Sequence, residues 1–205
     1  MTRAMRAADG RAGSMDGEHA PDAVALLDTP VGRLTIFVSD VGVAAIAWGD
    51  RQSHPSVGRE PARGVPVVDP QRTRPAVEQL TAYFDGDLTE FDLVLDLRGV
   101  TTTSRKVLET LCEKTPYGSS VTYGELAHSS NTGVPARGIG SIMGSNPVPI
   151  VVPCHRVLAS TGLGGYSGGN SGDGLRTKRW LLTLEGVLQP TLDWIDPRLT
   201  GRSDG

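Results

Sequence analysis

A cysteine followed directly by a histidine is the pair of residues in this chain best suited to covalent chemistry. Cys154 and His155 follow the apolar run from Pro149 to Val152, which predicts a strand-like segment that ends near the thiol. A cysteine attacks as its thiolate, and a nearby imidazole or polarised water can take up the proton. Free cysteines are also commonly buried as small apolar side chains. The pair by itself leaves a catalytic role and a packing role open.

Further short segments surround this pair in a fixed order. They read Tyr123-Gly124-Glu125-Leu126-Ala127, Pro135-Ala136-Arg137-Gly138-Ile139-Gly140, Ser145-Asn146-Pro147-Val148-Pro149-Ile150, Pro153-Cys154-His155-Arg156-Val157, Gly165-Tyr166-Ser167-Gly168-Gly169 and Trp180-Leu181-Leu182-Thr183-Leu184-Glu185-Gly186. In content and order they resemble the O6-alkylguanine-DNA alkyltransferases, a family of self-inactivating DNA repair proteins. The resemblance covers residues 23 to 188 and is strongest over residues 115 to 186.

The resemblance implies a methyltransferase that acts once, by moving the alkyl group of O6-alkylguanine irreversibly onto Cys154. It implies that His155 deprotonates the thiol through a water molecule and that Glu185 orients His155. Asn146 would brace the turn that carries the cysteine. Tyr123 would donate a proton or hydrogen bond to the leaving base and crowd the adjacent phosphate.

The resemblance also implies how the protein meets double-stranded DNA. Arg137 would enter the duplex and fill the space of the flipped nucleotide, while its helix, with Ala136 and Gly140, lies in the minor groove. Small residues on that helix suit close approach of the backbone, and flipping exposes an oxygen that stacking hides. The pocket for the flipped base would be formed by Met143, Val157, Tyr166 and Ser167.

Residue patterns in the first half predict a small α/β domain over residues 23–99. Short apolar or alternating runs between turn residues predict an antiparallel meander, and apolar residues at helical spacing predict one helix and a returning strand. The predicted strands are 23–27, 33–39, 43–48 and 93–97, and the predicted helix is 71–84. Residues 1–22 show no periodicity and are predicted to be a flexible tail outside the fold.

The second half predicts a mostly helical domain over residues 100–189, with a further tail at 190–205. Thr122 and Glu125 form a capping-box pattern, and Pro135 suits the start of the next helix. Two short helices joined by a turn have the proportions of a helix-turn-helix, whose second helix usually meets DNA. The predicted helices are 104–114, 122–129 and 136–144. Taken together, the patterns predict an α/β (α+β) fold with a helix-turn-helix and an active-site loop.

The charge distribution bears on DNA binding. A net charge of −3 argues at first against a partner that is itself anionic. Residues 100–189, however, hold eight Lys or Arg against five Asp or Glu, so the half that carries the motifs is the basic one. This modest excess predicts weak, salt-sensitive binding with few phosphate contacts.

Composition also bounds location and cofactors. The chain shows no apolar run of about 20 residues and no signal peptide, which predicts a cytoplasmic protein without a membrane segment. It is expected to be a monomer. Its two cysteines are then expected to be reduced, with Cys112 packed in a helix. The histidines and cysteines lack the spacing of zinc ligands, so no metal is expected, and no cofactor is expected because the lesion supplies the alkyl group.

Two other functions remain open. One is a lesion-binding module without transfer, as in the alkyltransferase-like proteins, which lack the cysteine at this position; Cys154 argues against it. The other is a thiol enzyme that acts on a small alkylated metabolite, which the acidic overall charge and the extended loop at 170–174 allow. Arg137 on a glycine-lined helix argues against this second alternative, because a small substrate needs no residue to replace a flipped base.

Overall fold

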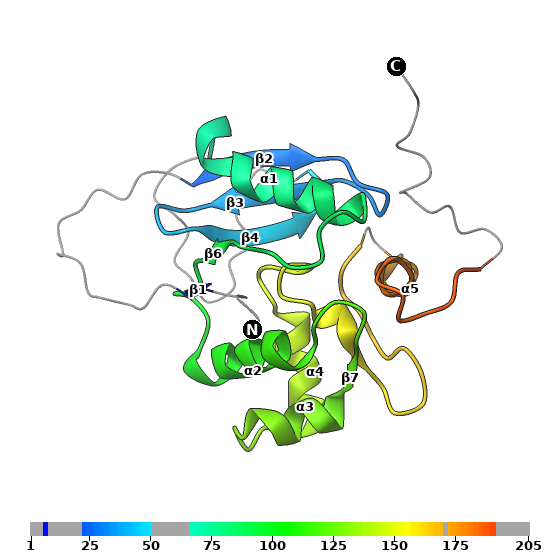
Figure 1. Ribbon diagram of the computed structural model, residues 1–205. Coiled ribbons are helices and arrows are strands. Elements are labelled where there is room, and N and C mark those ends of the chain that lie inside the picture. Colours follow the sequence, from blue (N-terminus) through cyan, green and yellow to red (C-terminus); the bar gives the residue numbers. More distant parts are fainter. Residues whose placement is uncertain (1–5, 8–21, 51–65, 170–171, 192–205) are drawn as a thin grey trace.

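A computed structural model describes residues 6–7, 22–50, 66–169 and 172–191 of the 205-residue chain. The described residues form an α/β fold in which a sheet with one covering helix precedes a mostly helical part (Figure 1). This arrangement confirms the predicted fold class, including the helix-turn-helix. Within the described ranges, no helix combines the length and the apolar character that a membrane span requires.

The N-terminal sheet is built on the three strands that the apolar pattern predicts. β2 (Ala23–Leu27), β3 (Leu34–Val38) and β4 (Val43–Trp48) pair antiparallel in chain order. Side chains of a strand point alternately to the two faces, and every residue of β3 is buried, so both faces of the sheet are covered there. The short strands β5 (Val67–Val68) and β6 (Val94–Leu95) pair parallel with β2 and β4. The predicted return of residues 93–97 to the sheet is therefore confirmed.

Part of the predicted N-terminal tail joins this sheet. Strand β1 (Arg6–Ala7) pairs parallel with β6, which gives the strand order β1-β6-β4-β3-β2-β5. The prediction that residues 1–22 stay outside the fold is wrong at this point, because a strand of two residues is too short to show a hydrophobic period. The rest of that tail up to residue 21, and the predicted C-terminal tail beyond residue 191, lie outside the described residues.

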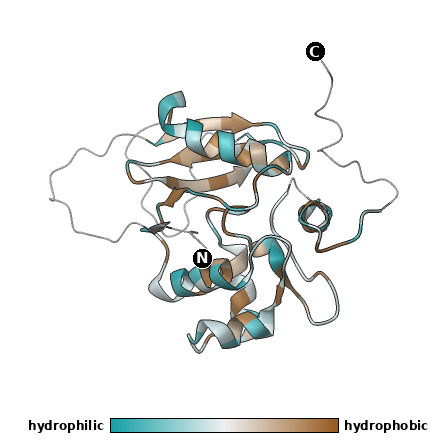
Figure 2. Ribbon diagram, in the orientation of Figure 1, coloured by the Kyte–Doolittle hydropathy of each residue, from teal (hydrophilic) through white to brown (hydrophobic). Residues whose placement is uncertain are grey.

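Helix α1 (Pro70–Phe84) covers one face of the sheet (Figure 1). It begins after Asp69, whose carboxylate accepts hydrogen bonds from the first free backbone N–H groups of the helix. Figure 2 shows hydrophobic residues over β2 to β4, whereas α1 also carries hydrophilic ones. The buried face of α1 includes Leu80, Tyr83 and Phe84. This face brings Tyr83 toward the C-terminal part.

The described residues of the C-terminal part form four α-helices, and local capping explains where two of them begin. Helix α2 begins at Thr102, earlier than predicted, because the Thr101 hydroxyl accepts a hydrogen bond from the Ser104 backbone over 3.2 Å. The predicted capping box of α3 is present, with the Thr122 N–H donating to Glu125 Oε2 over 2.7 Å. The helices are α2 (Thr102–Lys114), α3 (Tyr123–Ser130), α4 (Ala136–Gly144) and α5 (Gly174–Leu184).

The two parts share one hydrophobic core. A single cluster of buried residues contains Leu80 of α1, Leu111 of α2, Ile139 of α4 and Leu181 of α5. The backbone also connects the parts, since the N–H of Ile46 in β4 donates to the carbonyl of Pro147 over 2.9 Å. The N-terminal sheet therefore directly supports the segment that leads to Cys154.

Candidate active site

Asn146 braces the loop that leads from α4 to Cys154. Its Nδ2 donates to the carbonyl of Val152 over 2.8 Å, and its Oδ1 accepts a hydrogen bond from the Val148 N–H over 3.1 Å. A side-chain amide offers both donors and acceptors, so one residue satisfies two backbone groups of the loop. The loop is thereby closed on itself just before the thiol.

The backbone over residues 149–152 forms a turn, so the predicted strand-like segment is wrong. Pro149 has no N–H to donate to a ladder, and Ile150 has a left-handed φ of 76°. The Val152 N–H instead donates to the carbonyl of Val148 over 2.9 Å. A short 3-10 helix, η1 (Cys154–Arg156), follows directly. The thiol thus lies at the first position of a tight helical turn.

Cys154 is a buried thiol surrounded by hydrogen-bond donors. Only 5% of the residue is exposed. Burial raises the pKa of the thiol, and hydrogen bonding to Asn146, the positive charge of Lys178 and the N–H groups of Cys154 and His155 act in the opposite direction. Because the pKa remains raised, the resting thiol is protonated, and nucleophilic attack requires a base to remove its proton.

His155 and Glu185 form a buried pair beside this thiol. The His155 side chain is fully buried, and its Nε2 lies 2.8 Å from Glu185 Oε1. An ionised carboxylate only accepts hydrogen bonds, so Nε2 carries a hydrogen and Nδ1 is the ring nitrogen left to exchange a proton. Nδ1 is buried and has no hydrogen-bond partner among the described residues. His155 can therefore accept a proton at Nδ1 while Glu185 fixes its tautomer.

Glu185 receives hydrogen bonds from two further residues. Arg156 donates from Nε to Oε2 over 2.7 Å and from a terminal nitrogen to Oε1 over 2.9 Å. The hydroxyl of Tyr83 donates to Oε1 over 2.7 Å. Burial alone would raise the pKa of the Glu185 carboxyl, but its interactions with His155 and Arg156 outweigh burial and lower the pKa to about 2. The carboxylate is thus ionised at neutral pH.

Lys178 is a buried residue of this site that the sequence analysis missed. Its ammonium group donates to the carbonyl of Val157 over 2.6 Å and to that of Gly165 over 3.1 Å. Burial lowers the pKa of Lys178 to about 8, against the opposing effect of Cys154. The available signal was helical spacing, because Lys178 lies three and four residues before the buried Leu181 and Leu182.

Tyr123 lies beside the segment that follows Cys154. Strand β7 (Val121–Thr122) pairs parallel with β8 (Val157–Leu158), which places the start of α3 next to this segment. The Tyr123 ring lies against two glycines, since a Cβ on Gly140 would be 3.9 Å from the ring and one on Gly164 only 3.0 Å away. Its hydroxyl donates to the carbonyl of Gly165 over 3.3 Å. Burial and then the proximity of Cys154 raise the pKa of Tyr123, so the phenol stays protonated.

Helix α4 presents small residues and one cation on its exposed side. Ala136, Arg137, Ser141 and Gly144 are exposed, whereas Ile139 is buried in the core. Positions 137, 141 and 144 follow helical spacing, so they share one face. This face combines a positive charge with a surface that a neighbouring backbone can approach closely.

The four residues predicted to form the base pocket have different environments. Met143 is buried in the core, and Val157 is buried with its carbonyl bonded to Lys178. Tyr166 is half-buried, and its hydroxyl oxygen is buried without a hydrogen-bond partner among the described residues. Ser167 is exposed. Residues 170–171 of the extended loop lie outside the described residues.

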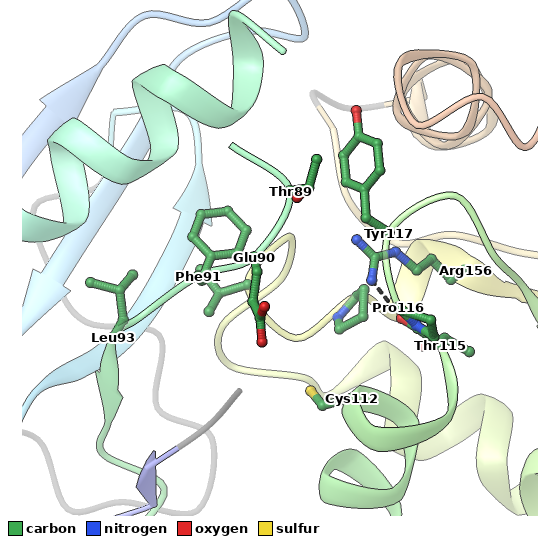
Figure 3. Close-up of a pocket in the computed structure, with 11 residues that line it drawn as sticks. Thr89, Glu90, Phe91, Leu93, Cys112, Thr115, Pro116, Tyr117 and Arg156 are labelled. Atoms are coloured by element: carbon green, nitrogen blue, oxygen red, sulfur yellow. Dashed lines mark hydrogen bonds between the residues drawn. The ribbon is translucent and has the colours of Figure 1, made fainter. Parts of the chain in front are cut away.

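A cavity of about 360 Å³ lies between the two parts of the chain, next to the loop that leads to Cys154 (Figure 3). Thr89, Glu90, Phe91 and Leu93 line it on the N-terminal side, and Cys112, Tyr117 and Arg156 line it on the other. None of the four predicted pocket residues borders it. Burial raises the pKa of the Cys112 thiol to about 12, so this second cysteine is a poor nucleophile.

A cluster of three or more His, Cys, Asp or Glu side chains arranged to hold a metal ion is absent from the part of the chain that the structure describes. Cys112 and Cys154 are both free thiols. The chemistry available at the site therefore comes from a buried thiol, a histidine-carboxylate pair, a buried lysine and a tyrosine hydroxyl.

Sequence comparisons identify related proteins over most of the chain. Residues 24–97 match the family described as "6-O-methylguanine DNA methyltransferase, ribonuclease-like domain", and residues 102–187 match "6-O-methylguanine DNA methyltransferase, DNA binding domain". A methylated-DNA:protein-cysteine methyltransferase of Mycolicibacterium paratuberculosis is 41% identical over 160 residues, which cover 78% of this chain and 89% of the relative. A protein with the same name from Mycobacterium tuberculosis is 41% identical over 162 residues, with the same coverage.

Solved structures agree with the sequence comparisons. The crystal structure of Mycobacterium tuberculosis O6-methylguanine methyltransferase has a TM-score of 0.65 and 37% identity, covering 83% of this chain and 96% of that one. A structure of the Mycobacterium tuberculosis protein in complex with DNA has the same TM-score and 38% identity, covering 80% and 92% of the two chains.

Proposed function

Because the chain belongs to the O6-methylguanine DNA methyltransferase family, we propose that it repairs DNA by moving the alkyl group of O6-alkylguanine onto its own Cys154. The observation that carries this proposal is the buried hydrogen bond of 2.8 Å between His155 and Glu185 beside a buried thiol. Such a pair supplies the base that a protonated cysteine needs. The product thioether has no easy hydrolytic route back, so each molecule acts once.

The reaction is a displacement at the alkyl carbon. The thiol proton passes through a water molecule to Nδ1 of His155, and the Cys154 sulfur attacks the carbon in line with guanine O6. A bond from sulfur to carbon forms, the bond from carbon to O6 breaks, and its electron pair stays on the guanine. The guanine takes a proton from the Tyr123 hydroxyl, and the proton that His155 took from the thiol returns to Tyr123 through water, which leaves neutral guanine and S-alkylcysteine. Glu185 keeps the His155 tautomer and favours the imidazolium that forms.

The buried cation of Lys178 favours the thiolate as it develops. Burial raises the pKa of the Cys154 thiol, and hydrogen bonding to Asn146 and the positive charge of Lys178 both act against that rise. Lys178 also holds the carbonyls of Val157 and Gly165, which flank the path of the flipped base. A carbonyl oxygen has two lone pairs, so Val157 can still accept a hydrogen bond from the guanine edge.

Tyr123 and Ser167 stabilise the leaving guanine in this proposal. The raised pKa of Tyr123 keeps its hydroxyl protonated and able to donate to the base. Ser167 is exposed, which suits a donor that meets O6 only when the base has entered. Met143 and Tyr166 form the apolar walls. An alkylated base then meets donors at the atoms where negative charge develops.

DNA binds across the exposed face of α4, in the minor groove. Arg137 lies on this face, and the small residues beside it allow the helix backbone to approach the duplex. We infer that Arg137 occupies the space of the flipped nucleotide. We also infer a division into domains at residues 23–99 and 100–189 and a monomer that acts in the cytoplasm, where the thiol stays reduced.

The two alternative functions are less well supported. A lesion-binding module without transfer has no need of a thiol with a histidine-carboxylate pair beside it. A thiol enzyme for small alkylated metabolites has no need of Arg137 on an exposed face of small residues. Both alternatives predict that duplex DNA does not alkylate Cys154.

Intact-protein mass spectrometry tests the proposal directly. Incubation with duplex DNA containing O6-methylguanine is expected to add one methyl group per molecule, and peptide mapping is expected to place it on Cys154. The Cys154 peptide from protein treated with unmodified duplex serves as the control. Folded protein with a reduced thiol that gains no methyl group would overturn the proposed function.

Replacing Arg137 by alanine is expected to lower the repair rate on duplex DNA about 100-fold, because unstacking a base costs a few kcal/mol that Arg137 no longer offsets. The rate with free O6-benzylguanine, which needs no flipping, is expected to stay within about twofold of the unmodified protein. Single-turnover assays with both substrates measure this ratio. Lys114→Ala, which removes another exposed cation, controls for the loss of charge, and equal losses on both substrates would exclude the flipping role.

A further inference from the structure

The N-terminal part of the chain contributes one side chain to the active site. Tyr83 lies on α1, only 1% of it is exposed, and its hydroxyl donates to Glu185 Oε1 over 2.7 Å. We propose that Tyr83 is a positioning residue of the alkyl-transfer reaction, which acts through Glu185 on the proton-accepting His155. This inference rests on the proposed function, because it assigns Tyr83 a role in that same reaction.

The aromatic rings around Tyr83 fix where its hydroxyl points. Its ring centroid lies 5.4 Å from that of Phe84, 5.4 Å from that of Phe91 and 6.3 Å from that of Tyr117. Edge and tilted contacts of this kind hold an aromatic ring in one orientation. The hydroxyl therefore reaches Glu185 from a rigid support and not from a mobile side chain.

Three donors share a single oxygen of Glu185. Oε1 accepts from Tyr83 over 2.7 Å, from His155 over 2.8 Å and from Arg156 over 2.9 Å, while Oε2 accepts from Arg156 over 2.7 Å. A carboxylate has about four lone-pair sites, so these four hydrogen bonds occupy about as many sites as the carboxylate offers. Glu185 cannot rotate without losing several charge-assisted hydrogen bonds, and His155 is oriented with it.

Each donor also stabilises part of the negative charge of the Glu185 carboxylate. A hydrogen bond from Tyr83 stabilises the carboxylate and weakens its pull on the His155 hydrogen. Burial, followed by the charge of Glu185, raises the pKa of Tyr83 well above its ordinary value, so the phenol remains a donor. The other ionisable groups around the relay are Cys154, Arg156, Tyr117, Tyr166 and Lys178. Tyr83 thus limits how strongly Glu185 attracts the hydrogen of His155, because both side chains donate to the same carboxylate oxygen.

The test is the pH dependence of Tyr83→Phe, which removes only the hydroxyl. Without this donor, Glu185 attracts the His155 proton more strongly, so neutral His155 is reached only at a higher pH. The acid limb of the rate of reaction with O6-benzylguanine is expected to move up by about one pH unit, with a rate about tenfold lower near pH 6 and close to that of the unmodified protein near pH 8.5. Affinity for alkylated duplex DNA is expected to be unchanged.

Tyr117→Phe is the matched control. Its hydroxyl donates over 3.0 Å to the backbone carbonyl of Leu184, the residue before Glu185, so this hydrogen bond goes to the backbone and not to the carboxylate. Both variants lose a tyrosine hydroxyl with a hydrogen bond, and only Tyr83→Phe is expected to move the pH profile. An unshifted profile for Tyr83→Phe, in protein that still transfers the benzyl group, would overturn the positioning role. Failure of the unmodified protein to take the methyl group from O6-methylguanine in duplex DNA would instead overturn the proposed function.

A second variant covers the case in which Tyr83→Phe does not fold. Replacement of Tyr83 alone by 3-fluorotyrosine keeps the ring and the hydroxyl but makes the hydroxyl a stronger donor. Glu185 is then stabilised further and holds the His155 proton less tightly, so the acid limb is expected to move to lower pH. A profile identical to that of the unmodified protein would again contradict the proposal.

Discussion

A Cys154→Ser variant is expected to bind alkylated duplex DNA nearly as well as the unmodified protein and to transfer no alkyl group. Serine has almost the same shape, so the hydrogen bonds that reach the thiol from Asn146 and the loop backbone can form to its hydroxyl. A hydroxyl is far harder to ionise than a thiol, and loss of the nucleophile is expected to lower the transfer rate at least about 10⁴-fold. Mass spectrometry after incubation with methylated duplex measures transfer, and fluorescence anisotropy measures binding.

The second cysteine provides the control for this substitution. Cys112 is buried, and its pKa is raised to about 12, so Cys112→Ala is expected to retain transfer. Residual methylation of the Cys154→Ser protein would mean that another group is the nucleophile. Loss of DNA binding in that variant would mean that the thiol also supports the DNA-binding surface.

Replacing Glu185 by glutamine is expected to lower both the reaction rate and the stability. The amide cannot fix His155 as a base or favour its imidazolium, which is expected to lower the rate about 100-fold or more. The guanidinium of Arg156 loses its ionised partner in a buried position, which is expected to lower the free energy of unfolding by about 3 kcal/mol at neutral pH. Single-turnover kinetics with O6-benzylguanine and urea denaturation measure the two effects.

The pH dependence of this stability loss follows from the pKa of Glu185. Its pKa is about 2 in the folded protein and 4.5 for an ordinary glutamate, so the unfolded chain binds the proton more readily. The stabilisation is therefore fully present above about pH 4.5 and is lost as the pH falls toward 2. The difference in unfolding free energy between the variant and the unmodified protein is expected to shrink over this range. Glu113→Gln, at an exposed position of α2, is the control, and a difference independent of pH would contradict the assignment.

Local sequence patterns predicted the elements whose causes are local. Short apolar runs between turn residues predicted the bounds of β2 and β4, and the hydrogen bond from Thr122 to Glu125 that begins α3 depends on residues three positions apart. The apolar run before Cys154 misled the same kind of reasoning. Its composition fits a strand, but Pro149 and the left-handed Ile150 make it a turn.

Local sequence patterns could not predict the parts of the site that depend on contacts between residues far apart in the sequence. Tyr83 and Glu185 are 102 residues apart, and nothing near either residue indicates the other. Lys178 was overlooked because a lysine is ordinarily expected in solvent, although its helical spacing to Leu181 placed it on the buried face. Glu185 by itself reads as a surface acid at a helix end, and only the family resemblance pointed to His155 as its partner.

The left-handed turn at Ile150 makes reactivity depend on packing. A β-branched residue in this region of backbone space carries strain of about 1–3 kcal/mol, which glycine would largely avoid. The strain is tolerated because the Ile150 side chain is completely buried and the surrounding core holds it in place. The Ile150 side chain therefore contributes both to the stability of the core and to the position of the Cys154 thiol, so a substitution at this residue changes both properties together. Slight loosening of this core would spread the thiol over several positions while the protein remains folded, which makes reaction rate a finer gauge of its integrity than melting temperature.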